Sequence, residues 1–127
     1  MKSAFSINWR SSTKPRKQTK FRANAPLHIR GSFLNVNLSK ELRAKYARRN
    51  LRVRKEDKVK ILRGQFKGKT GLVEKISIAN TKVFVAGISL TKKDGAKVPY
   101  ALNPSNLMIL ELNLTDKKRM KKLEKRN

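Results

Sequence analysis

Hydrophobic and polar residues alternate along much of the chain after residue 50, with the period of two that β-strands have. Val59 and Ile61 alternate with Lys58 and Lys60, so one face of this segment would be buried and the other hydrated. β-branched and aromatic residues favour further strands over residues 72–78, 82–88, 88–90, 96–100 and 107–110. Short strands at this spacing, with no crossover helix between them, predict a small β-barrel.

Turn sequences separate these strands. Asn80-Thr81 and Asn103-Pro104-Ser105-Asn106 are rich in turn-forming residues, and Lys92-Lys93-Asp94-Gly95 contains the Asp-Gly pair favoured in tight hairpins. We therefore expect the strands to be joined by short turns.

The segment before the barrel has the period of a helix. Leu38, Leu42 and Tyr46 recur every four residues, and Ser39 is a suitable N-cap. This pattern predicts a short helix over residues 38–50 whose apolar stripe packs on the barrel.

Two further segments have weaker helical signals. One or two helical turns are expected after Pro26, because proline suits the start of a helix. A terminal helix is expected over residues 115–126, with Thr115 as its cap. This helix has few apolar residues, so it would be marginal alone.

Residues 1–24 show no sustained period and are polar and basic, with aromatic residues at Phe5, Trp9 and Phe21. Free in solution, such a segment is typical of a disordered tail. Bound to RNA, its cations could hold phosphates and its rings could stack on bases. The two interpretations are compatible, so we expect an arm that is extended when bound.

Charge identifies the class of partner. The net charge is +25, from 33 Lys and Arg against 8 Asp and Glu, and Glu41 is the only acid in the first 55 residues. Such a polycation needs an anionic partner, and closely spaced phosphates favour nucleic acid through counterion release. A membrane surface would need a basic helix with a large apolar face, which no segment offers.

The residue types present restrict the possible chemistry. Cysteine is absent, which excludes disulfides, thiolate zinc sites and cysteine nucleophiles, and His28 is the single histidine. No apolar run approaches the ~20 residues of a spanning helix, and the N-terminus lacks a signal-peptide pattern. We therefore expect a soluble intracellular protein with no catalytic residue, no metal, no cofactor and no small-molecule substrate.

A glycine-rich stretch, RGQFKGKTGLV, occupies residues 63–73. A P-loop needs four residues between its first glycine and the Gly-Lys pair, and a helix after it. Here only three residues separate Gly64 from Gly68, and a predicted strand follows. Gly64, Gly68 and Gly71 instead fit a bend between two strands at a barrel corner, because glycine tolerates positive φ and close backbone approach.

This glycine spacing resembles the KOW motif, which several ribosomal proteins share with NusG-type transcription factors. The flanks are more specific and are similar to the KOW-bearing large-subunit ribosomal proteins of archaea and eukaryotes, counterparts of the bacterial assembly initiator. The matching stretches are Lys14-Pro15-Arg16-Lys17-Gln18, residues 24–30, residues 38–43, Val53-Arg54-Lys55, Lys93-Asp94-Gly95 and residues 103–106. The resemblance covers residues 14–120, and the short C-terminal segment is more typical of archaeal members.

The resemblance implies a mainly β fold: an SH3-like barrel bound to large-subunit rRNA in the cytoplasm. It also implies a role in early subunit assembly and a place near the peptide exit tunnel, beside neighbouring ribosomal proteins and nascent-chain factors. The expected organisation is a basic extended arm (1–24), a short helical segment (25–50), the barrel (51–112) and a basic C-terminal helix (113–127).

The residues expected to contact rRNA are mostly basic and lie in the arm, the helical segment and the glycine stretch. They are Arg10, Lys14, Arg16, Lys17, Lys20, Arg22, His28, Arg30, Lys40, Arg43, Arg48, Arg49, Arg52, Arg54, Arg63, Lys67 and Lys69. Each could alternatively be an ordinary solvated surface residue. For His28 in particular, base stacking or phosphate binding and a plain surface role are both open.

Two other functions remain alternatives. A KOW-type transcription elongation factor would need a polymerase-binding domain, for which the 50 residues before the barrel leave little room. An enzyme would have no cysteine, no second histidine and no clustered pair of carboxylates to use.

Overall fold

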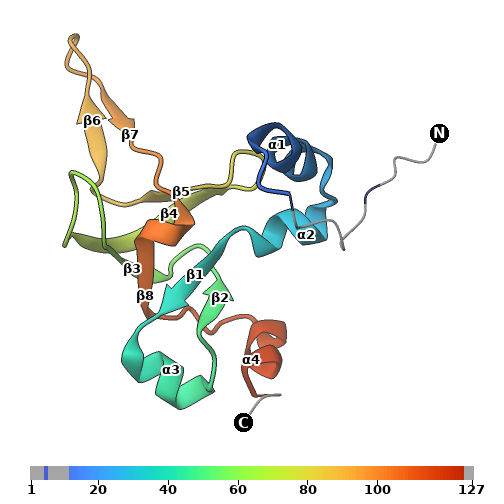
Figure 1. Cartoon of the computed structure of the whole chain (residues 1–127). Helices are drawn as coiled ribbons and strands as arrows, with labels where there is room; N and C mark the ends of the chain where they lie inside the picture. Colours follow the sequence, from blue (N-terminus) through green and yellow to red (C-terminus); the bar gives the residue numbers. More distant parts are fainter. Residues whose placement is uncertain (1–4, 6–11, 125–127) are drawn as a thin grey trace.

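The fold combines a six-stranded sheet with a two-stranded hairpin and short helices (Figure 1). The computed structural model describes residue 5 and residues 12–124. The helices are α1 (Pro15–Asn24), α2 (Leu27–Ser32), α3 (Lys40–Tyr46), the 3₁₀ turn η1 (Pro104–Asn106) and α4 (Lys117–Glu124). The strands are β1 (Asn35–Leu38), β2 (Asn50–Arg52), β3 (Lys58–Ile61), β4 (Thr70–Ser77), β5 (Lys82–Val85), β6 (Ser89–Thr91), β7 (Lys97–Pro99) and β8 (Leu107–Glu111).

The large sheet has the strand order β2-β1-β8-β3-β4-β5 and curls into a barrel-like arrangement that does not close. Only β1 and β8 run parallel, and the other pairs in this sheet are antiparallel. A register shift between Val73 and Lys75 marks a β-bulge in β4. The mainly β fold with short helices agrees with the sequence-based prediction.

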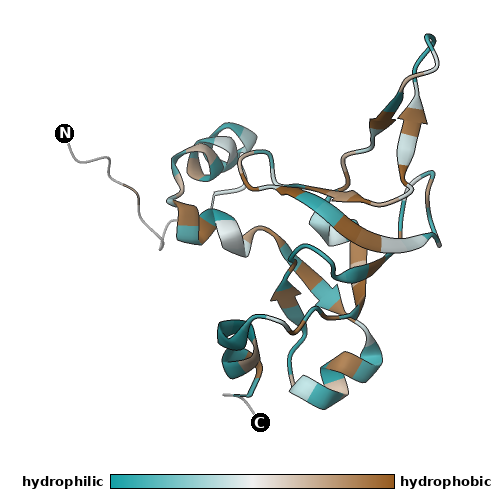
Figure 2. Cartoon of the chain, turned by 180° about the vertical axis from the view of Figure 1, so that it is seen from behind, coloured by the Kyte–Doolittle hydropathy of each residue, from teal (hydrophilic) through white to brown (hydrophobic). Residues whose placement is uncertain are grey.

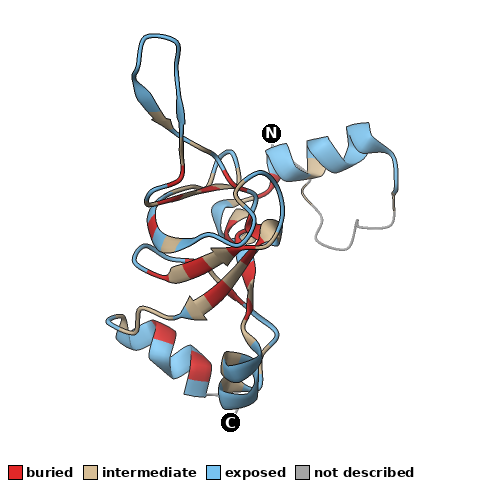
Figure 3. Cartoon of the chain, turned by 90° about the vertical axis from the view of Figure 1, so that its left-hand side faces the viewer, coloured by how far each residue is buried: buried red, intermediate tan, exposed pale blue. Residues whose placement is uncertain are grey.

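The core lies inside the curled sheet and follows the predicted alternation (Figure 3). Val59 and Ile61 on β3 are buried, whereas Lys58 and Lys60, which alternate with them, are half-buried. On β8, Leu107 and Ile109 alternate with half-buried residues in the same way. Period-two burial of β-branched and leucine side chains therefore builds one continuous core.

Strands β1 and β2 were not predicted, because residues 25–50 were expected to be helical. β1 reads Asn-Val-Asn-Leu, and asparagine is disfavoured in strands. Val36 and Leu38 nevertheless face the core with no exposed surface, and Leu51 of β2 lies opposite Val36. Tertiary pairing with β8 outweighs the weak local preference, so the barrel begins before residue 51.

Residues 15–24 form helix α1, whereas an extended arm was expected. Pro15 occupies the first turn, where its fixed φ suits a helix, and Arg, Lys and Gln have high helix propensity. The helix has no buried residue and little amphipathic pattern, which is why its period was not visible in the sequence. Phe21 anchors it, with ring centroids 5.0 Å from Phe5 and 6.2 Å from Phe33.

Helix α3 agrees with the prediction. The Ser39 hydroxyl accepts a hydrogen bond from the Leu42 N–H at 3.4 Å, as an N-cap does. Leu42 and Tyr46 pack against the core, and Ala47 ends the helix in the left-handed conformation.

Helix α4 docks on the barrel through an ion pair that the sequence did not reveal. The Arg119 guanidinium donates to both carboxylate oxygens of Asp57 at 2.7 Å, and the two side chains are 3% and 0% exposed. Leu123, one turn later, is buried in the core. The cap is Asp116 rather than Thr115, because the Asp116 carboxylate accepts from the Lys118 N–H at 2.9 Å.

The glycine stretch forms the connection from β3 to β4. Gly64 and Gly68 have φ of +97° and +88°, which other residues adopt only with strain. The Gly68 N–H donates to the Ile61 carbonyl at 2.8 Å, and the Ile61 N–H donates to the Lys69 carbonyl at 2.9 Å, which closes the turn. Gly71 serves close packing instead: a Cβ there would lie 2.7 Å from Val85 Cγ1 and 2.8 Å from the Ala86 oxygen.

Replacing Gly71 by alanine should lower the free energy of unfolding by about 1–3 kcal/mol, because the added methyl group overpacks β4 against β5. Thr70→Ala, at an exposed neighbouring position, is the control and should change stability by less than about 0.5 kcal/mol. Urea unfolding of both variants measures the difference. Equal stabilities would mean that the two strands separate without cost.

Candidate nucleic-acid interface

Helix α1 carries an exposed cationic surface. Arg16, Lys17, Lys20 and Arg22 lie on it, the helix contains no acidic residue, and Lys14 precedes it. All five side chains are exposed. Such a helix can follow a line of phosphates.

Helix α2 continues this surface. His28 is exposed, and so is its neighbour Leu27, at 69%. Arg30 turns back instead: its Nε donates to the Ala25 carbonyl at 3.0 Å and its Nη2 donates to the Ala23 carbonyl. Arg30 thus fixes α2 against the end of α1.

Four other arginines expected to contact rRNA also have internal roles. The Arg43 Nε donates to the Leu38 carbonyl at 2.9 Å, and the Arg48 Nη2 donates to the Lys122 carbonyl of α4 at 2.5 Å. Arg54 forms an ion pair with Asp116. The Arg52 guanidinium covers Gly31, where a Cβ would lie 2.4 Å from Nη1.

These arginines therefore have an internal structural role in addition to the two predicted alternatives, phosphate contact and solvation. Guanidinium carries five N–H donors, so one or two internal bonds leave others for a ligand. An internal bond also fixes the direction of the group, which reduces the entropy lost on binding.

The connection from β3 to β4 carries a second cationic group. Arg63, Lys67 and Lys69 are exposed on it. The Lys69 ammonium lies 5.2 Å from the centre of the Phe66 ring, and Phe66 packs edge-on against Tyr100 at 5.0 Å. The packing of Phe66 on Tyr100 anchors this turn to the rest of the fold.

The predicted contact residues lie on separate faces of the molecule. Helices α1 and α2 stand on one side of the barrel, the β3–β4 connection lies on the opposite side, and α3 lies at one end (Figure 1). Lys40 and Arg49 are exposed near the two ends of α3. Arg10 lies outside the described residues. One straight duplex could not reach all these positions, so a nucleic-acid partner would have to surround the protein.

Hydrophilic residues dominate the surface elements, whereas the hydrophobic ones follow the strands (Figure 2). Within the part of the chain that the structure describes, no group of three or more His, Cys, Asp or Glu side chains could hold a metal ion. No helix among the same residues is long and apolar enough to cross a membrane.

A groove of about 540 Å³ separates α1 and α2 from the β4–β5 turn. Its lining includes Arg22, Arg30, Lys82 and Phe33, and no acidic residue among those described. Lys82 was not predicted as a contact; its Nζ donates to the Asn103 side-chain oxygen at 2.6 Å. The signal that could have identified it is its position beside the Asn80-Thr81 turn.

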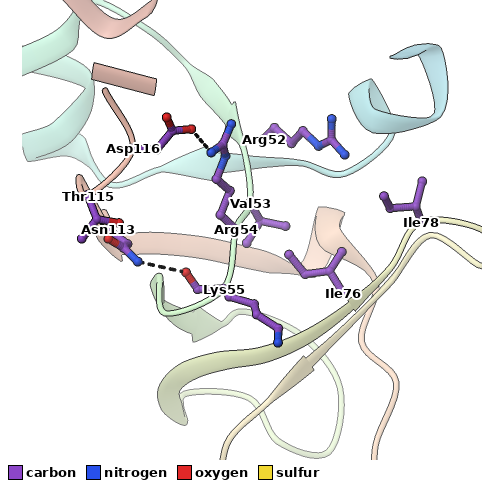
Figure 4. Close-up of a pocket in the computed structure, with 9 residues that line it drawn as sticks. All are labelled: Arg52, Val53, Arg54, Lys55, Ile76, Ile78, Asn113, Thr115 and Asp116. Carbon is purple, nitrogen blue, oxygen red and sulfur yellow. Dashed lines mark hydrogen bonds and ion pairs between the residues drawn. The ribbon is translucent and has the colours of Figure 1, made fainter. Parts of the chain in front are cut away.

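A second groove, of about 440 Å³, opens between the segment after β2 and the end of β4 (Figure 4). Its cations are Arg52, Arg54 and Lys55. Lys55 was likewise not predicted as a contact, although it directly follows Arg54, which was. Asp116 is the acidic residue in this lining, and it is paired with Arg54.

The pKa of Asp116 lies below its ordinary value of 3.8, chiefly because the Lys118 N–H donates to the carboxylate, with Arg54 beside it and partial desolvation opposing both. A lowered pKa in the folded state stabilises the fold above the unfolded-state pKa, and this contribution is lost as the pH falls through the folded-state value.

Wild-type protein should therefore be more stable than Asp116→Asn near neutral pH, and the difference should shrink below about pH 4. Thermal unfolding of both proteins from pH 7 to pH 2 measures this. A difference that stayed constant over the whole range would show that the charge on Asp116 contributes nothing.

Comparisons with known proteins concern nearly the whole chain. A family model that describes the ribosomal proteins L26 of eukaryotes and their archaeal L24 counterparts matches residues 12–126. "Large ribosomal subunit protein uL24" of Methanocorpusculum labreanum is 51% identical over 114 residues, covering 90% of this chain and 94% of the relative. The protein of the same name from Methanospirillum hungatei is 52% identical over 112 residues, covering 88% of this chain and 93% of the relative.

Proposed function

Because the chain belongs to the family of eukaryotic L26 and archaeal L24 ribosomal proteins, we propose that it binds large-subunit rRNA through cationic elements held by the half-open barrel. The chain is a structural constituent of the large ribosomal subunit in the cytoplasm. Its archaeal-type relatives agree with the resemblance found in the sequence. Membership of this family also agrees with the prediction that the protein is not an enzyme.

The observation that carries this proposal is the placement of the charge. A net charge of +25 resides on a chain of 127 residues, and exposed cations lie on α1, α3, α4, the β3–β4 connection and the β6–β7 hairpin. Only a large polyanion with several surfaces can neutralise groups on so many sides. Folded rRNA has this property, because its helices and loops pack into a three-dimensional surface.

Binding involves no bond chemistry. The barrel holds the cations in fixed directions, and each phosphate that they neutralise releases condensed counterions. Phosphate contacts position the protein but carry little sequence information. Specificity in this scheme comes from the shape of one rRNA region, because only that region places phosphates against all the cationic elements together.

We also infer a role in early assembly and a place near the peptide exit tunnel, as the resemblance to KOW-bearing large-subunit proteins implies. A protein that bridges several rRNA segments holds them close together, so the later folding of the RNA loses less entropy. Such a protein is most useful at an early step of assembly. The β6–β7 hairpin projects away from the barrel (Figure 1), and its Leu90 is 46% exposed. This hairpin is available to neighbouring ribosomal proteins and to nascent-chain factors.

No feature of the structure favours the alternative of a transcription elongation factor, and the family that matches the chain is ribosomal. Helices α3 and α4 pack on the same contiguous core as the barrel strands. A separate polymerase-binding domain is therefore not part of the described fold.

The test is the salt dependence of binding to a large-subunit rRNA transcript. If about ten cations each neutralise one phosphate, log K should fall against log salt with a slope near −7. A small-subunit rRNA transcript of similar length is the control for non-specific binding and should bind more weakly at each salt concentration. Equal affinity for both transcripts, or a slope near zero, would contradict the proposal.

A further inference from the structure

The second groove exists because β4 leaves its neighbour. At Val73, β4 is held to the loop before β3: the Glu56 N–H donates to the Val73 carbonyl at 2.9 Å, and the Val73 N–H donates to the Asp57 carbonyl at 3.0 Å. The bulge between Val73 and Lys75 follows at once, and a bulge bends the strand that contains it. The end of β4 therefore diverges from the segment 52–55 and leaves an opening.

The floor of this opening is apolar. Ile76 lies opposite Val83 in the β4–β5 register, and Val83 is fully buried, so both side chains belong to the core face of the sheet. Ile76 and Ile78 are nevertheless only half-buried. With Val53 they line the groove. Figure 4 shows Ile76 and Ile78 on the β4 side of the opening, and Arg52, Val53, Arg54 and Lys55 on the segment after β2. Part of the core face is thus left open to the surface.

The rim of the groove carries a net positive charge, because its one carboxylate is already paired with an arginine. The Asp116 carboxylate is paired with the Arg54 guanidinium and accepts a hydrogen bond from the Lys118 N–H. The Arg52 side chain and the exposed Lys55 side chain form no ion pair with any residue in the described part of the chain. An apolar floor beside two available cations fits a ligand with a flat apolar body and an anionic backbone.

We propose that this groove holds one unpaired nucleotide of the rRNA, with its base against Ile76 and Ile78 and its flanking phosphates at Arg52 and Lys55. The proposal rests on the proposed rRNA binding and names a site within it. The volume of about 440 Å³ lies in the range of small-molecule sites. Unpaired bases in RNA loops and bulges are commonly splayed out and packed on protein side chains, and apolar side chains can hold an extruded base.

The first experiment locates the contact on the unaltered protein. A large-subunit rRNA transcript substituted with 4-thiouridine is bound to the full chain, irradiated with long-wave ultraviolet light and digested. Mass spectrometry then identifies the peptides that carry nucleotide adducts. We expect adducts on peptides that contain residues 52–55 or 76–78.

The second experiment separates base contact from charge. Ile76→Ser with Ile78→Ser should weaken binding about tenfold, because the apolar packing of the base against the two isoleucines is lost. The slope of log K against log salt should stay unchanged, because no phosphate contact is lost. Lys55→Gln should instead make the slope shallower by about 0.7–0.9.

Leu72→Ser is the matched control. Leu72 lies on the same strand, is 51% exposed and is not part of the groove, so its replacement should change affinity by less than about twofold. Thermal unfolding of each variant verifies that it is folded at the temperature of the binding assay.

The outcomes separate this site from the general proposal. If wild-type protein binds large-subunit rRNA, but no adduct falls in the groove and the double serine variant binds like wild type, the groove does not hold a nucleotide. If wild-type protein does not bind this rRNA at all, the proposed function fails together with the site. If the groove peptides crosslink to another protein in intact subunits, the groove is a protein-docking site and our assignment is wrong.

Discussion

Replacing Arg119 by methionine is expected to lower the free energy of unfolding by about 3–5 kcal/mol, because it leaves the Asp57 carboxylate buried without its cation. Arg119 also donates to the Asn113 carbonyl at 2.9 Å and to the Arg52 carbonyl at 3.2 Å. Its loss therefore releases α4 and leaves two backbone acceptors unpaired. Denaturant unfolding at neutral pH measures the effect.

Lys58→Met is the matched control for this prediction. Lys58 pairs with Glu111 at 3.0 Å, but neither side chain is buried: Lys58 is 43% exposed and Glu111 is 71% exposed. An exposed ion pair is worth no more than about 1 kcal/mol, so this variant should remain close to wild type. Similar losses in the two variants would show that burial of the Asp57–Arg119 pair is unimportant.

A double-mutant cycle that combines Arg119→Met with Asp57→Ala measures the coupling between the two side chains. Once Arg119 is gone, removing Asp57 no longer separates a buried pair, so the double variant should lose less stability than the sum of the two single variants. Additive losses would mean that the two side chains act independently.

Deleting residues 1–24 is expected to weaken binding to large-subunit rRNA by at least about a hundredfold at physiological salt, because five or more phosphate contacts are lost. The barrel should remain folded, since α1 contains no buried residue and is anchored through Phe21. Filter binding measures the affinity, and circular dichroism with thermal unfolding measures the fold.

A variant with glutamine at Lys14, Arg16, Lys17, Lys20 and Arg22 separates charge from the helix itself. Glutamine has a helix propensity similar to that of lysine and arginine, so α1 should persist. This variant should reproduce most of the loss and should make the salt slope shallower by about 4. If the glutamine variant bound like wild type while the deletion did not, contacts other than charge would explain the role of α1.

The β-strand pattern was predictable where burial alternates within one segment. Burial alternates along β3, β5 and β8, which lie in predicted strand segments, and the β6–β7 hairpin lies on either side of the predicted Asp94-Gly95 turn. In these segments the local preference and the tertiary environment agree, so the sequence alone is sufficient.

The missing parts depend on contacts between residues far apart in the chain. β1 contains two asparagines and is held by pairing with β8, some 70 residues later. α1 has helix propensity but no apolar stripe, so its hydrophobic residues do not recur with the period of a helix. In neither segment does a repeating pattern of hydrophobic residues reveal the secondary structure.

The candidate interface was predictable as a class but not as an arrangement. Composition predicted an anionic partner, and the basic residues expected to bind it are mostly exposed. Their division into exposed cations and inward-bonded arginines such as Arg30 and Arg43 could not be predicted, because each bonds a backbone carbonyl positioned by the fold. The buried ion pair of Asp57 was not predicted either, because its partner Arg119 lies 62 residues away in the sequence.

The most direct test of the central claim uses the protein inside the cell. A tagged chain is crosslinked to RNA with ultraviolet light, the lysate is separated on a sucrose gradient, and the RNA attached to the protein is sequenced. We predict that the protein sediments with the large subunit and that the crosslinked reads fall in a few defined regions of large-subunit rRNA. Sedimentation apart from the subunit, with reads spread over other RNAs, would contradict the account.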